Sequence, residues 1–213
     1  MTILGAIAVD AETAVAWADS ALFAADTGAP IGHVSKLAVN PLACMAGVGA
    51  GWNTVAVEGM NALTAAIGLD ELVEELPAKL RRVAFRVAPQ MERLDPGSFA
   101  SCVFAAVGWS RQYGRMLVFE FAATSAFEPL MTTSVCIPEL PPLTVPGGPD
   151  WFGIACAAEA QMREFRCLKP ETDGHLVVAM LRSGSITAGP LLDFTVGAPA
   201  SVRPSRSSST APS

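Results

Sequence analysis

The residues at the start of the chain could supply a nucleophile together with its own base. Threonine follows the initiator methionine, and because its side chain is small, we expect Met1 to be trimmed so that the chain starts at Thr2. Thr2 would then carry a hydroxyl and a free α-amine on one residue. An α-amine, with a reference pKa of roughly 7.7–8.0, can accept the hydroxyl proton near neutral pH. Many proteins begin with Met-Thr for other reasons, so the residues that follow decide whether the pair matters.

Residues further along the chain are of the types that assist such a nucleophile. Lys36 could place a positive charge beside the Thr2 oxygen, and Asp19 could pair with Lys36 and fix it in an apolar site. The glycine-rich turn at 46–51 could aim a backbone N–H at the oxyanion of a tetrahedral intermediate, a role that we assign to Gly49. The extra glycine at position 51 leaves this register open by one or two residues. Without further information, a turn aspartate, an exposed strand-end lysine and glycines that allow tight packing are the simpler interpretation.

The order of these residues resembles the proteasome β-type family of N-terminal nucleophile hydrolases. The segment 17–20 (WADS) is similar to the family's Ala-Ala-Asp-Ser/Thr segment, and 35–37 (SKL) is similar to its Lys-hydrophobic segment. The segment 47–54 (GVGAGWNT) is similar to the Gly-Ala-Gly-Thr-Ala-Ala-Asp-Thr turn. The resemblance is greatest to the bacterial Anbu-like branch, in which the nucleophile directly follows the initiator methionine, and it covers roughly residues 1–90.

The resemblance implies roles for six residues: the catalytic set Thr2, Asp19 and Lys36, the oxyanion amide of Gly49, and supporting contacts from Ser20 and Asp173. It also implies a specificity pocket formed by small or apolar residues at strand ends, which would suit a hydrophobic substrate side chain: Leu22, Val34, Ala38, Gly47 and Val55. The family carries a serine that braces the terminal amine, and the loop 146–149 (PGGP) has none.

Apolar runs predict the elements that must position this set. We expect strand pairs at 3–9 with 13–19, 34–39 with 42–48, 99–107 with 115–123 and 175–181 with 186–194, and a further strand at 131–137. Their nearly continuous apolar content predicts strands covered on both faces. Helical spacing predicts helices at 53–67 and 70–91, the second with a break or kink near Leu76 because Pro77 follows, and a third helix at 151–167.

Strand blocks interrupted by helix blocks predict an α+β fold. The resemblance implies a four-layer αββα sandwich, with a reduced second helical layer because 150–168 holds one helix where the family has two. We expect a single domain at 1–196 and a disordered Ser/Pro-rich tail at 197–213.

The composition excludes several classes of function. A hydrophobic content of 51% with only 16% charged residues favours a large core or extensive subunit contacts, and a net charge of −6 offers no basic surface for nucleic acid. No apolar run is long enough to span a membrane, and the N-terminus lacks the features of a secretory signal, so we expect a cytoplasmic protein. The five cysteines are scattered, which predicts reduced thiols and neither a metal site nor a cofactor.

The sequence therefore predicts a threonine-type peptidase or amide hydrolase that acts on a peptide substrate and assembles into a homo-oligomer, as a ring or a helical assembly. Two alternatives stay open: a catalytically inactive proteasome-like structural or assembly subunit, and a small-molecule amidase or acylase of the same fold. The sequence identifies neither the substrate nor an unfoldase partner.

Overall fold

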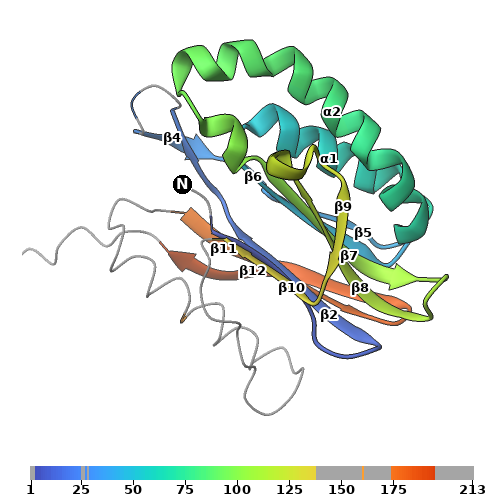
Figure 1. The fold of residues 1–213 in the computed structure, drawn as a ribbon. Helices are drawn as coiled ribbons and strands as arrows, with labels where there is room; N and C mark the ends of the chain where they lie inside the picture. Colours follow the sequence, from blue (N-terminus) through green and yellow to red (C-terminus); the bar gives the residue numbers. More distant parts are fainter. Residues whose placement is uncertain (1–2, 25–26, 28, 138–159, 161–173, 195–213) are drawn as a thin grey trace, which may run out of the picture.

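Two antiparallel sheets stacked face to face form the centre of the molecule. The computed structural model describes residues 3–24, 27, 29–137, 160 and 174–194 (Figure 1). One five-stranded sheet has the order β10 (Ser134–Ile137), β1 (Leu4–Ala8), β2 (Thr13–Asp19), β11 (Gly174–Arg182) and β12 (Ser185–Phe194). The other five-stranded sheet has the order β5 (Leu37–Asn40), β6 (Met45–Ala50), β7 (Val103–Ser110), β8 (Arg115–Ala122) and β9 (Pro129–Thr132).

The space between the two sheets is filled mostly by small side chains. Alanines alternate along β2 at 14, 16 and 18, and they meet Ala46, Val48 and Ala50 of β6 in one buried cluster. Successive residues of a strand point to opposite faces, so every second residue lies on the same face. The remaining residues of β6, at 45, 47 and 49, therefore point to its other face, toward the helices. The prediction that these strands are covered on both faces is confirmed for the second sheet.

Two helices cover the outer face of the second sheet (Figure 1). α1 (Asn53–Ala65) approaches β6 closely, since a Cβ on Gly49 would lie 2.7 Å from the Ala56 Cβ. The sequence predicts an apolar stripe of Leu72, Leu76, Leu80, Val83 and Val87 on α2 (Leu69–Leu94), of which the first four are buried and Val87 is partly buried. The expected break near Leu76 does not occur, and the helix continues through the buried Pro77 because tertiary packing of this stripe outweighs the lost backbone hydrogen bond.

Two features differ from the sequence prediction. A short hairpin of β3 (Ala21–Phe23) and β4 (Pro30–His33), which the sequence did not predict, follows β2 and precedes β5 along the chain. The strand expected at 131–137 is two strands, because the chain passes from one sheet to the other at Thr133: β9 pairs with β8, and β10 pairs with β1. The Thr132 hydroxyl donates to the Ser134 carbonyl and accepts from its N–H, which supports this crossing.

The observed elements confirm the α+β class. The expected helix at 151–167 and the tail at 197–213 lie outside the described residues, apart from one helical residue at position 160, so the fourth layer stays a prediction. Among the described helices, none is long and apolar enough to cross a membrane.

Candidate active site

A buried ion pair joins two of the predicted catalytic residues. Asp19 is the last residue of β2, and Lys36 directly precedes β5, so the two sheets bring them together. The Lys36 Nζ donates to both carboxylate oxygens of Asp19, at 3.0 Å to Oδ1 and 3.1 Å to Oδ2. Both side chains are almost completely buried, with 9% of the Lys36 side chain exposed and 0% of that of Asp19. A buried pair of this kind requires good geometry and further hydrogen bonds to offset the cost of desolvation.

The backbone supplies those further hydrogen bonds. The Ile3 N–H donates to Asp19 Oδ1 at 2.8 Å, and the Ala21 N–H donates to Oδ2 at 3.1 Å. The Asp19 N–H in turn donates to the Ile3 carbonyl at 2.9 Å. Asp19 thus ties the start of the chain to Lys36. Thr2 lies outside the described residues, and Ile3 is its immediate neighbour in the sequence.

Burial dominates the protonation of the pair. Desolvation raises the pKa of Asp19 above its ordinary value, although the charge of Lys36 and the hydrogen bonds from Ile3, Lys36 and Ala21 oppose this. Desolvation likewise lowers the pKa of Lys36, opposed by the charge and the hydrogen bonds of Asp19. The pKa values of the two groups therefore lie closer together than those of the same groups in water. Shifted pKa values of this kind are common among catalytic groups.

The Gly49 amide, to which the sequence assigns the oxyanion role, already has a hydrogen-bond acceptor. The Gly49 N–H donates to the Lys36 carbonyl at 3.1 Å, so it is occupied by the pairing of β5 with β6. Gly51 lies just past the end of β6, where its φ of +88° takes it out of the strand, so its N–H is not part of the pairing of β5 with β6. Within the described part of the chain, nothing accepts a hydrogen bond from this N–H. The Gly51 N–H is therefore the alternative candidate for the oxyanion role, within the range of one or two residues that the sequence left open.

Position 51 requires glycine for two reasons. Its φ of +88° lies in the left-handed region, and a Cβ there would lie 2.6 Å from the Cys102 Cα. The Cys102 sulfur also accepts a hydrogen bond from the Trp52 N–H at 3.4 Å. Cys102 thus packs against the glycine turn. Burial raises the pKa of the Cys102 thiol, so Cys102 is an inert packing residue rather than a nucleophile.

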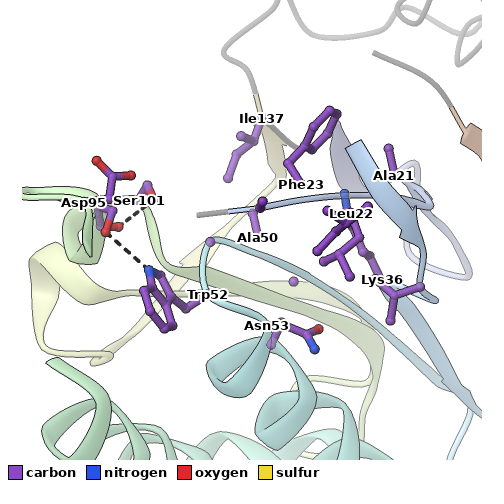
Figure 2. Close-up of a pocket in the computed structure, with 17 residues that line it drawn as sticks. Ala21, Leu22, Phe23, Lys36, Ala50, Trp52, Asn53, Asp95, Ser101 and Ile137 are labelled. Carbon is purple, nitrogen blue, oxygen red and sulfur yellow. Dashed lines mark hydrogen bonds between the residues drawn. The ribbon is translucent and has the colours of Figure 1, made fainter. Parts of the chain in front are cut away.

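A cleft with a volume of about 620 Å³ opens beside Lys36 (Figure 2). Apolar side chains of the β3–β4 hairpin line one side, among them Leu22, Phe23 and Ile31. The end of β6 and the start of α1 line the base, with Gly49, Gly51 and the Trp52 indole. A concave, mostly apolar space with a few polar groups is the usual form of a ligand site.

The predicted pocket residues divide into two groups. Leu22 and Val34 line the cleft as expected. Ala38, Gly47 and Val55 do not: Val55 is buried and Ala38 packs in the core between the helices and the second sheet, and a Cβ on Gly47 would meet Leu63 and Phe104 there. These three positions therefore belong to the core between the helices and the second sheet rather than to the cleft.

The structure describes one of the two residues that were predicted to support the catalytic set. Ser20 is buried next to Asp19, and its Oγ lies 3.3 Å from Nδ1 of His33. Asp173 lies outside the described residues.

Sequence reasoning missed four residues that line the far side of the cleft: Trp52, Asp95, Ser98 and Ser101. Three of them come from the end of α2 and the 3₁₀ helix Ser98–Ser101, which no motif connected with Lys36. Trp52 immediately follows the glycine turn, and a large aromatic residue at that place was the available signal.

Comparison with known proteins gives the fold of the chain. No family model and no curated protein matches it. The described fold is similar to that of a solved structure. The similarity is to the solved structure of a mutant of Anbu from Hyphomicrobium sp. strain MC1, with a TM-score of 0.65 and 12% sequence identity over 90% of this chain and 87% of that chain. At this identity the likeness shows the fold alone.

Proposed function

We propose that the chain is a threonine-type amide hydrolase that cleaves peptides with Thr2 as its nucleophile. The observation that carries this proposal is the buried Asp19–Lys36 pair, whose carboxylate also binds the N–H of Ile3, the residue next to Thr2. One peptide unit therefore separates Thr2 from a residue held against the pair. The mostly apolar cleft that opens beside this pair supports a role in substrate binding.

The chemistry follows from the groups at the site. The Thr2 hydroxyl proton passes to the α-amine, and the Thr2 oxygen bonds to the substrate carbonyl carbon. The Lys36 charge favours the ionised hydroxyl, and the Gly51 N–H donates to the oxyanion. The carbon–nitrogen bond then breaks, and the leaving nitrogen takes the proton from the α-ammonium. Water hydrolyses the resulting ester and restores Thr2.

Mass spectrometry with a peptide epoxyketone tests the nucleophile. This probe needs two nucleophiles on one residue, because a hydroxyl adds to its ketone and an amine opens its epoxide. We expect an intact mass without Met1 and a single adduct located at Thr2. Thr2→Ala should abolish the adduct, and Lys36→Met should nearly do so, because residues that act as a unit fail together.

Lys79→Met is the matched control. Lys79 is an exposed lysine of α2, and it is not among the described residues that line the cleft. A retained Met1, or labelling that survives in Thr2→Ala, would contradict the proposal. A processed chain that never reacts would favour the inactive-subunit alternative. Turnover of small amides but not of peptides would favour the amidase alternative.

We further propose that the protein forms a homo-oligomer through its two described helices. Large apolar side chains are exposed on α2 and in the connection between α1 and α2, namely Phe85 at 83% and Ile67 at 73%. Exposed apolar surface of this kind is typical of an interface. Light scattering should give a mass several times 22.1 kDa. Phe85→Asp should reduce it, and a monomeric wild-type chain would contradict the proposal.

A further inference from the structure

The far side of the cleft differs chemically from the side near Lys36. Figure 2 shows Lys36, Leu22 and Phe23 on one side, and Trp52, Asp95 and Ser101 on the other. The Trp52 indole is fixed there, because its Nε1–H donates to the Ser98 hydroxyl at 3.3 Å. The described residues therefore form an apolar channel with an aromatic wall and a polar end.

The charge of the cleft is unbalanced at that end. Among the described residues that line it, Lys36 and Asp95 carry charge. Lys36 is neutralised by its ion pair with Asp19. The Asp95 carboxylate has neither a hydrogen bond nor an ion pair with any residue that the structure describes. The described lining of the cleft thus presents one negative charge that no described residue compensates.

Asp95 does not stabilise the helix that carries it. It caps the C-terminus of α2, where its backbone N–H donates to the Met91 carbonyl at 2.8 Å. The helix dipole places partial negative charge at a C-terminus, so an acidic side chain is unfavourable there and a basic one is favoured. The backbone bond serves any residue type equally, so it does not require the carboxylate, which makes no hydrogen bond or ion pair with a described residue.

We propose that this end of the cleft is a second substrate subsite that binds a lysine or arginine side chain of the peptide, and this rests on the proposed function of the Thr2 site. Lysine and arginine have apolar stems that pack along hydrophobic surface while their charged heads reach a polar group. Here the stem would lie along Trp52, and the head would reach the Asp95 carboxylate. The serine hydroxyls at 98 and 101 offer further acceptors for the donors of the head group.

Peptide binding tests the subsite without requiring turnover. The Thr2→Ala protein is titrated with acetyl-Xaa-Ala-Ala-Leu-amide, acetyl-Ala-Xaa-Ala-Leu-amide and acetyl-Ala-Ala-Xaa-Leu-amide, where Xaa is arginine, norleucine or glutamate. Calorimetry measures each Kd. At one position we expect arginine to bind about fivefold to tenfold more tightly than norleucine, as expected for a solvent-accessible ion pair combined with an aromatic contact. Glutamate should bind most weakly.

Charge reversal makes the test specific. Asp95→Asn should remove the preference for arginine, and Asp95→Lys should make glutamate the preferred residue. Neither variant threatens the fold, because the side chain has no described partner and a lysine suits a helix C-terminus. Glu74→Gln is the matched control, since Glu74 is an exposed acid of the same helix outside the cleft lining and should leave the preference unchanged.

The outcomes separate this inference from the proposed function. Equal affinity for arginine and norleucine peptides at every position would overturn it, as would a preference that persists in Asp95→Lys or the absence of any binding. If the epoxyketone fails to react but the preference appears and reverses, the subsite stands and the catalytic assignment fails. If the probe reacts and no preference appears, the catalytic assignment stands and the subsite inference fails.

Discussion

Replacing Lys36 by methionine should destabilise the protein far more than any surface lysine substitution. The change keeps the length of the side chain and removes its charge, so Asp19 is left buried without its ion-pair partner. Breaking a buried pair in this way costs about 3–5 kcal/mol. The N–H groups of Ile3 and Ala21 still bind the carboxylate, so we expect a value near the lower limit, about 3 kcal/mol.

The loss should depend on pH in a defined direction. Burial already raises the pKa of Asp19 above 3.8, and removal of the Lys36 charge raises it further. Between 3.8 and that raised value, the folded state binds more protons than the unfolded state, so stability increases as the pH falls through this window. Urea unfolding of Lys36→Met should therefore give a smaller deficit relative to wild type in acidic buffer than at pH 8.

Two further variants complete this experiment. Lys79→Met removes an exposed lysine with an i,i+4 partner in Glu75, and it should cost only about 0.3–0.5 kcal/mol. The double variant Asp19→Asn with Lys36→Met removes both charges, so most of the stability should return while the Thr2 reactivity stays lost. The reasoning is refuted if Lys36→Met is within 1 kcal/mol of wild type, on the scale set by surface pairs, or if the double variant is less stable than either single one.

Two other substitutions probe the surroundings of the site. Gly51→Ala should reduce epoxyketone labelling about 100-fold, as loss of an oxyanion donor does, because its Cβ would collide with Cys102, whereas Gly97→Ala has a similar φ of +82° in open space and should retain labelling. Normal labelling of Gly51→Ala would contradict the assignment of its amide. Asn40→Ala should lower the unfolding free energy measured in urea by about 1–3 kcal/mol, because the Asn40 Nδ2 donates to the Leu63, Thr64 and Ala66 carbonyls at the end of α1. A variant as stable as wild type would show that these carbonyls find other partners.

The sequence predicted most of the secondary structure because apolar spacing determines it. The β1–β2 and β7–β8 pairs and both described helices lie where the periodicity places them, within a few residues. The β9–β10 crossing could not be predicted, since residues 131–137 form one continuous strand-like segment and only long-range pairing divides it. The continuity of α2 through Pro77 also depends on packing that local propensity does not describe.

The sequence predicted some parts of the candidate site and not others. Asp19 and Lys36 come together because each ends or precedes a strand, and strand ends gather at the same edge of a sandwich. The glycine register and the pocket residues depend on which face or edge each position occupies. Gly47, Gly49 and Gly51 look alike in the sequence, yet Gly47 packs against the core and Gly49 and Gly51 line the cleft. The order of residue types therefore identified the pair, while the lining of the cleft required coordinates.

The far side of the cleft has consequences for the alternatives left open by the sequence. An inactive assembly subunit has no need of an acidic residue at a helix C-terminus, where its charge is unfavourable and its carboxylate has no partner among the described residues, or of a tryptophan fixed beside it. A small-molecule amidase would be served by the space near Lys36 alone. A cleft that extends from Lys36 to Asp95 is better matched to an extended chain, which can place one residue at the pair and a basic side chain at the other end. The peptide series with Asp95→Lys therefore bears on the substrate class as well as on the subsite.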